Sequence, residues 1–173
     1  MRAITAALLL SLHVASARAF AMGDVPPVGV TPWGVHTAFG ADPATTLTIM
    51  WSTRVSTSSI VTLTAAGGGP QRVAGEIIPF SDVGNIQTLH RVRLTDLTPA
   101  TAYSYTVGDG SSTVNATSRV FNFETPPAQN WSPYIAVFGD MGVTSNALAT
   151  MPLLLADAAG GKLDVTVHIG DLA

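Results

Sequence analysis

The chain has 173 residues, of which 47% are hydrophobic and 11% are charged, and its formal net charge at pH 7 is −3. It contains no cysteine, which excludes a disulfide framework, a thiol nucleophile and a cysteine-ligated zinc site. Lys162 is the only lysine and no basic run occurs, so neither a nucleic acid nor an anionic membrane surface is expected as a partner.

Residues 1–21 have the pattern of a secretory signal peptide. Arg2 precedes an apolar run from Ala6 to Leu10, and two strings of small residues, Ala17-Arg18-Ala19 and Ala19-Phe20-Ala21, are candidate cleavage sites. The apolar run is far shorter than the ~20 residues that a membrane span requires. We therefore expect a secreted, extracellular protein without a membrane span, cleaved after Ala19 or Ala21.

Residues 25–125 have the pattern of an all-β sandwich of the fibronectin type III kind. Short segments alternate apolar and polar residues, as half-buried strands do. The inward-facing residues that this alternation predicts are Leu47, Ile49, Trp51, Val61, Leu63, Ala65, His90, Val92, Leu94, Tyr103, Tyr105, Val107, Phe121 and Phe123. The string from Leu97 to Tyr103 resembles the tyrosine-corner region of such sandwiches.

A glycosylation acceptor, Asn115-Ala116-Thr117, lies in a polar turn of this predicted sandwich. We expect a glycan on Asn115 in a eukaryotic host. A second acceptor, Asn130-Trp131-Ser132, is followed by Pro133, which usually hinders modification.

Residues 126–173 begin with a stiff Pro126-Pro127 hinge and then have a β-α-β pattern. The apolar runs 134–138 and 163–169 predict two buried strands, with an amphipathic helix between them. Parallel strands joined in this way have their carboxyl ends at the same edge of a sheet.

The helix is expected to begin near Met151 and to end at Gly160-Gly161. Thr150 is a suitable N-cap, and Pro152 would then lie in the first turn, where its missing N–H is harmless. A start at Ser145 would place this proline inside the helix, at a cost of roughly 3 kcal/mol. Residues 142–149 are therefore expected to form a loop.

Each of the two predicted strands is followed by a Gly-Asp pair, Gly139-Asp140 and Gly170-Asp171. A single Gly-Asp pair at a strand end is usually only a turn. Its repetition one crossover later, at an edge where open α/β sheets bind ligands, favours a shared metal site with Asp140 and Asp171 as ligands. His168 lies within the second strand, and no ligand role is predicted for it.

The two Gly-Asp strings resemble motifs of the metallophosphoesterases, and among them of the purple acid phosphatases. Gly139-Asp140-Met141-Gly142 matches the family's GDxG motif in full, and Gly170-Asp171-Leu172-Ala173 matches the first four positions of its GDxxY motif. Larger members of the family place a sandwich ahead of the catalytic domain, and Trp33-Gly34-Val35-His36 resembles that accessory domain. The resemblance implies that residues 126–173 are the start of a calcineurin-like α/β metallophosphoesterase domain, truncated after its first β-α-β unit.

The same resemblance implies a dinuclear centre. Asp140 would bind Fe(3+), and Asp171 would bridge it to a second divalent metal, which is Zn, Mn or Fe. The substrate would be a phosphate monoester. The family's tyrosine, asparagine and histidine ligands fall outside the chain, so no catalytic residue is assigned and the fragment alone is expected to be inactive.

Two function classes remain open from the sequence. The first is a secreted metal-dependent acid phosphatase represented by its N-terminal portion. The second is a noncatalytic extracellular sandwich that binds a partner and carries a vestigial tail. The sequence beyond Ala173 distinguishes them, since a tyrosine at the next position followed by a Gly-Asn-His string would establish the first.

Overall fold

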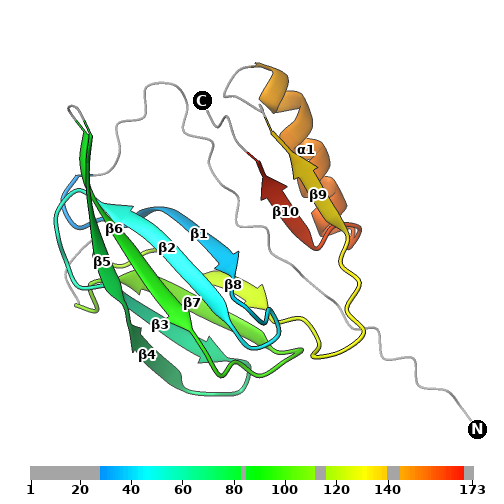
Figure 1. The fold of residues 1–173 in the computed structure, drawn as a ribbon, viewed down its shortest axis with the longest axis horizontal. Helices are drawn as coiled ribbons and strands as arrows, with labels where there is room; N and C mark the ends of the chain where they lie inside the picture. The colour runs from blue at the N-terminus through cyan, green and yellow to red at the C-terminus, as the bar shows by residue number, and fades with distance from the viewer. Residues whose placement is uncertain (1–27, 83–84, 112–115, 140–144, 170–173) are drawn as a thin grey trace, which may run out of the picture. The chain divides into compact units, whose positions relative to one another are not determined.

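A computed structural model of the chain describes residues 28–82, 85–111, 116–139 and 145–169 (Figure 1). The chain divides into two compact units at the boundary between Trp131 and Ser132. The first unit contains two antiparallel sheets, and the second contains two parallel strands and a helix. No helix in the described ranges is long and apolar enough to cross a membrane.

The first unit is an all-β sandwich of two four-stranded sheets (Figure 1). One sheet has the order β1-β2-β6-β5, with the bounds Trp33–Phe39, Leu47–Thr53, Asn85–Leu94 and Glu76–Asp82. The other has the order β4-β3-β7-β8, with the bounds Pro70–Ala74, Ile60–Ala65, Ala102–Gly108 and Phe121–Glu124. The predicted sandwich is therefore confirmed at the level of its sheets.

One hydrophobic core joins the inner faces of β2, β3, β6 and β7. Its buried members are Leu47, Ile49, Trp51, Val61, Leu63, Val92, Leu94, Leu97, Tyr103, Tyr105 and Val107. Phe121 and Phe123 of β8 are half-buried and extend the core, since their rings stack on Tyr105 and Tyr103 with centroids 5.3 and 5.1 Å apart. The alternation read from the sequence is thus confirmed in all of these strands.

The tyrosine corner predicted from the sequence is also present. The backbone N–H of Thr98 donates to the phenol oxygen of Tyr103 at 2.9 Å, and the tyrosine is buried at the start of β7. The hydroxyl of Thr125 donates to the Thr98 carbonyl at 2.6 Å, and the N–H of Ala100 donates to the Pro126 carbonyl at 3.1 Å. The corner therefore fixes the point at which the chain leaves the last strand.

We expect Tyr103→Phe to lower the free energy of unfolding by about 1–3 kcal/mol, because it leaves the partly buried Thr98 N–H without its acceptor. Urea unfolding followed by far-ultraviolet circular dichroism measures the change. Tyr134→Phe is the matched control, because Tyr134 is 68% exposed and its loss should cost less than about 0.5 kcal/mol. Equal losses in the two variants would contradict a role for the corner.

The second unit contains β9 (Ile135–Phe138), α1 (Ser145–Ala159) and β10 (Val165–His168) in β-α-β order. The two strands pair in parallel, as predicted. Figure 1 shows α1 beside this strand pair, and the helix residue Ala158 is buried.

The predicted start of the helix is wrong. α1 begins at Ser145 rather than near Met151, so residues 145–149 are helical instead of loop and Pro152 lies inside the helix. Residues 147–149 are Ala, Leu and Ala, which are strong helix formers. Pro152 is exposed, so water can hydrate the carbonyl that loses its intrahelical N–H partner. These two effects offset the penalty that the sequence argument assigned to the proline.

The predicted end of the helix is confirmed. Gly161 has a φ of 67°, and its N–H donates to the Ala158 carbonyl at 3.1 Å, while the N–H of Lys162 donates to the Asp157 carbonyl at 2.9 Å. This pair of bonds is the Schellman motif, which requires a left-handed residue and so favours glycine. The chain is thereby turned back toward β10.

Candidate functional site

The parallel pairing of β9 and β10 brings the ends of the two strands together. Phe138, the last residue of β9, is in register with His168, the last residue of β10. The N–H of Ile169 donates to the Phe138 carbonyl at 2.9 Å, so the pairing continues one residue past the strands. The backbone therefore leaves both strands at the same edge, which is the edge where the sequence predicts a site.

The opposite end of the strand pair is held by Asp164. Its carboxylate accepts the N–H of Tyr134 at 2.8 Å, and its own N–H donates to the Tyr134 carbonyl at 2.9 Å. The N–H of Val165 donates to the same carbonyl at 3.2 Å. These bonds set the register of the strands, which in turn aligns their carboxyl ends.

The predicted metal ligands follow these strand ends. Asp140 comes two residues after Phe138 and Asp171 comes three residues after His168, and both aspartates lie outside the described residues. The predicted glycosylation residue Asn115 also lies outside them. Within the described ranges, no three His, Cys, Asp or Glu side chains gather as a metal site would require.

One face of the strand pair is apolar and uncovered within its unit. Ile135 and Val137 are 51% and 60% exposed, and Val167, which pairs with Val137, is 40% exposed. Ile169, just past β10, is 70% exposed. Parallel strands are normally covered on both faces, so this face has the character of an interior surface.

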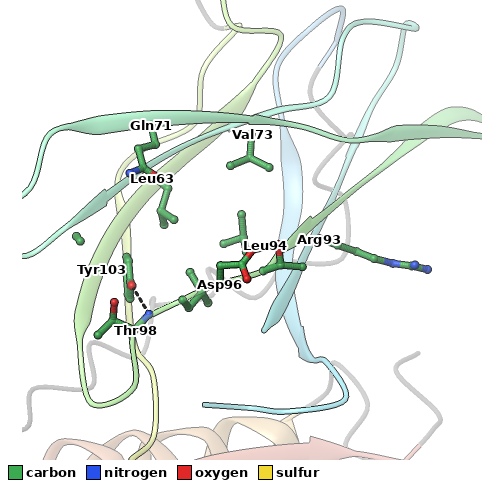
Figure 2. Close-up of a pocket in the computed structure, with 11 residues that line it drawn as sticks. Leu63, Gln71, Val73, Arg93, Leu94, Asp96, Thr98 and Tyr103 are labelled. Atoms are coloured by element: carbon green, nitrogen blue, oxygen red, sulfur yellow. Dashed lines mark hydrogen bonds between the residues drawn. The ribbon is translucent and has the colours of Figure 1, made fainter. Parts of the chain in front are cut away.

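A crevice in the sandwich is lined by residues of β3, β4, β6 and β7 and of the loop that follows β6 (Figure 2). Its volume is about 230 Å³, and its lining residues are Leu63, Ala65, Gln71, Val73, Arg93, Leu94, Thr95, Asp96, Leu97, Thr98 and Tyr103. Core leucines form its apolar part and the tyrosine corner forms one wall. Figure 2 shows the Arg93 guanidinium pointing away from the other lining side chains.

The crevice has no arrangement for catalysis. Asp96 is its only carboxylate, and this group accepts the Thr95 hydroxyl at 2.9 Å. No serine, cysteine or histidine lines the crevice to serve as a nucleophile or a base. The edge formed by β9 and β10 is therefore the better candidate for chemistry.

Comparison with known proteins identifies the family to which the sandwich belongs. The family model described as "Purple acid Phosphatase, N-terminal domain" matches residues 32–125, which are the sandwich. Acid phosphatase type 7 of Homo sapiens is 33% identical over 87% of this chain and 34% of its own length. The Mus musculus protein of the same name is 33% identical over 83% of this chain and 33% of its own length.

A plant relative matches over a shorter range. Purple acid phosphatase 15 of Arabidopsis thaliana is 34% identical over 61% of this chain and 20% of its own length. The chain spans about a third of the length of the two mammalian relatives that it matches. Because the family model covers more than half of the chain, the chain belongs to the purple acid phosphatase family and carries its N-terminal domain.

Proposed function

We propose that the chain is the N-terminal portion of a secreted acid phosphatase, a metal-dependent hydrolase of phosphate monoesters with a dinuclear metal site. In this proposal residues 25–125 are the accessory fibronectin type III-like sandwich, and residues 126–173 begin the calcineurin-like catalytic domain. Relatives named acid phosphatases and purple acid phosphatases support it.

The observation that carries the proposal is the parallel register of β9 and β10. Because Phe138 and His168 are paired, the two strands end at one edge of the sheet, and in the sequence Asp140 and Asp171 follow these strand ends by two and three residues. Two carboxylates at one edge fit a hard, oxygen-preferring cation such as Fe(3+) or a divalent Zn, Mn or Fe. Asp140 would hold the ferric ion, and Asp171 would hold both ions.

A pair of such ions, when bound, polarises a phosphoryl oxygen and lowers the pKa of a bound water. In this proposal the chain contributes the carboxylates of Asp140 and Asp171, which follow the paired ends of β9 and β10 in the sequence. Two carboxylates are too few to hold two cations, so activity also requires ligands from further chain.

The uncovered face of the second unit supports the same proposal. Ile135, Val137 and Ile169 expose at least half of their surface. An α/β domain would cover this face with further helices. A vestigial tail has no such requirement, and polar substitutions would be expected to accumulate there.

The test compares residues 22–173 with the full-length product of the same gene, both secreted from a eukaryotic host. Metal analysis and hydrolysis of p-nitrophenyl phosphate at mildly acidic pH are the measurements. We expect two metal ions and turnover in the long protein, and neither in the short one. N-terminal sequencing of the secreted material is expected to show cleavage after Ala19 or Ala21.

Two results would overturn the proposal. Stoichiometric metal and turnover in residues 22–173 would show that the missing ligands are unnecessary. A long protein without metal or turnover would favour the noncatalytic sandwich module instead.

A further inference from the structure

The imidazole of His90 lies in the core of the sandwich, where it hydrogen-bonds hydroxyls at the start and at the end of the link between β2 and β3. Its ring is fully buried on β6. Its Nε2 is 2.8 Å from the hydroxyl of Thr53, the last residue of β2, and its Nδ1 is 2.8 Å from the hydroxyl of Ser59, directly before β3. Residues 54–59, called here the β2–β3 connection, carry the chain from one sheet to the other.

The hydroxyls of Thr53 and Ser59 also have hydrogen-bond acceptors elsewhere, which limits whether they can donate a proton to the His90 ring. The Thr53 hydroxyl donates to the Val55 carbonyl at 2.6 Å, and the Ser59 hydroxyl donates to the Glu76 carbonyl at 3.0 Å. Each hydroxyl has only one proton, so both could then only accept from the ring, which would need an N–H on each nitrogen. A neutral imidazole has one N–H.

In the neutral state one hydroxyl must therefore turn its proton to the ring. The Thr53 bond to Val55 is the shorter of the two, so Ser59 is the one expected to turn and donate to Nδ1. The neutral ring of His90 then carries its proton on Nε2 and donates it to Thr53. This tautomer is assigned by counting donors and acceptors.

Among the described residues, no carboxylate contributes to the pKa of this ring, which burial alone shifts. On one side the indole of Trp51 stacks on it, with centroids 4.9 Å apart and planes 6° apart. Arg91 and Glu76, the charged pair of β6 and β5, bond each other at 2.7 Å, and both side chains are partly exposed. Arg54, in the connection, is a cation and cannot balance such a charge, and burial raises the pKa of the Tyr105 phenol on β7 to about 12, so that the phenol stays neutral.

Burial therefore decides the charge state of His90. Protonation would complete one more hydrogen bond, but the cost of burying an uncompensated ion exceeds the gain from one bond. Burial lowers the pKa of His90 from 6.5 to about 4. The ring stays neutral while the connection is closed.

We propose that His90 is a proton-operated latch on the β2–β3 connection: the connection is closed over a neutral ring, and in mildly acidic solution the ring takes up one proton when the connection opens. The connection contains exposed residues, and the imidazole bonds Thr53 directly before it and Ser59 at its end, so opening of the connection would bring water to the ring. Opening breaks those two bonds and hydrates the ring, which then has the proton affinity of an ordinary histidine.

The sign and size of the pH dependence follow from the thermodynamic linkage between opening of the connection and proton binding by His90. The open state binds a proton below about pH 6.5 and the closed state only below about pH 4. Between these values the opening constant rises about tenfold for each unit that the pH falls, because one proton is bound on opening. Above pH 6.5 and below pH 4 the dependence disappears.

Amide hydrogen exchange of the whole chain tests this directly. Two amides flank the latch: the N–H of Arg54, which donates to Gly29 at 3.1 Å, and the N–H of Gly75, which donates to Ser59 at 2.9 Å. After correction for intrinsic exchange, we expect their protection to fall about tenfold per pH unit between pH 6.5 and 4. Protection of the Ala66 amide, bonded to Ala102 at 2.9 Å, should not follow this slope when it exchanges through a local opening that leaves His90 buried.

Two variants separate the latch from general acid sensitivity. His90→Gln keeps hydrogen-bonding groups but does not titrate in this range, so the slope at Arg54 and Gly75 should vanish. Thr57→Ala changes the connection without touching the ring and should keep the full slope. A flat profile in the unmodified chain, or an equal slope in His90→Gln, would overturn the proposal. If His90→Gln does not fold, the contrast between the slope at Arg54 and Gly75 and the slope at Ala66 in the unmodified chain decides.

Discussion

Asp171→Asn in the full-length protein is expected to lower kcat/KM for p-nitrophenyl phosphate by more than about a hundredfold. Asparagine has the same size as aspartate but is neutral, so it neither bridges two cations nor screens their mutual repulsion. The metal content of the purified variant should fall together with its activity. Metal analysis and kinetics on the same preparation check both quantities.

Asp157→Asn is the matched control for this variant. Asp157 is in the same unit, but its carboxylate is exposed on α1 and lies 3.7 Å from the ammonium of Lys162. Exposed ion pairs of this kind contribute about 0–1 kcal/mol to the free energy of unfolding. The activity and metal content of Asp157→Asn should therefore stay at the level of the unmodified protein. Unchanged metal and activity in Asp171→Asn would remove Asp171 from the proposed site.

Trp51→Ala is expected to lower the free energy of unfolding of the sandwich by about 3–5 kcal/mol. Trp51 is the largest fully buried side chain of the described core and is 1% exposed. Its removal leaves a cavity between the sheets and also removes the ring that stacks on His90. Because small domains have only about 5–15 kcal/mol of stability, this loss should be visible as a large fall in the urea midpoint.

Trp131→Ala makes the same chemical change at the edge of the sandwich. Trp131 is half-buried and contacts Phe39 edge to face, with centroids 5.8 Å apart. An aromatic contact of this kind contributes about 0.5–1.5 kcal/mol. Similar losses in the two variants would mean that position within the core does not determine the cost.

The strands of the sandwich could be predicted from the sequence because the alternation that marks a strand involves only residues close together in the chain. Residues such as Leu47, Ile49 and Trp51 are two positions apart, and a strand has only two faces, so alternation directly identifies the inner face. The tyrosine corner was equally accessible, since Thr98 and Tyr103 are close in the chain. Strand pairing within the sandwich, by contrast, depends on contacts across the whole unit and came only from the structure.

The start of α1 shows where a local rule was insufficient. The rule that proline begins a helix placed the start near Met151, but the helix begins at Ser145. Exposure of Pro152 reduces the cost of its position, and exposure is a property of the folded chain rather than of its pattern. The end of the helix was predicted correctly because Gly161 requires a left-handed backbone, which is a local property.

The functional features were predicted only in part, because a sequence pattern does not show which distant residues come into contact. The order of strand and helix was enough to expect Asp140 and Asp171 at one edge, and their role as metal ligands stays a prediction. The contacts of His90 could not be foreseen, because Thr53 and Ser59 are 37 and 31 positions away in the chain. A histidine at an inward position of a strand was the one available signal.

The division of the chain at Trp131 also has a consequence for biosynthesis. Every pairing partner of the sandwich strands lies within residues 24–131, so the sandwich can complete its core while later residues are still being translated. The strand pair of the second unit emerges with Ile135 and Val137 uncovered. Exposed apolar surface and unpaired strand edges favour aggregation, so the second unit is expected to depend on chaperones more than the sandwich does.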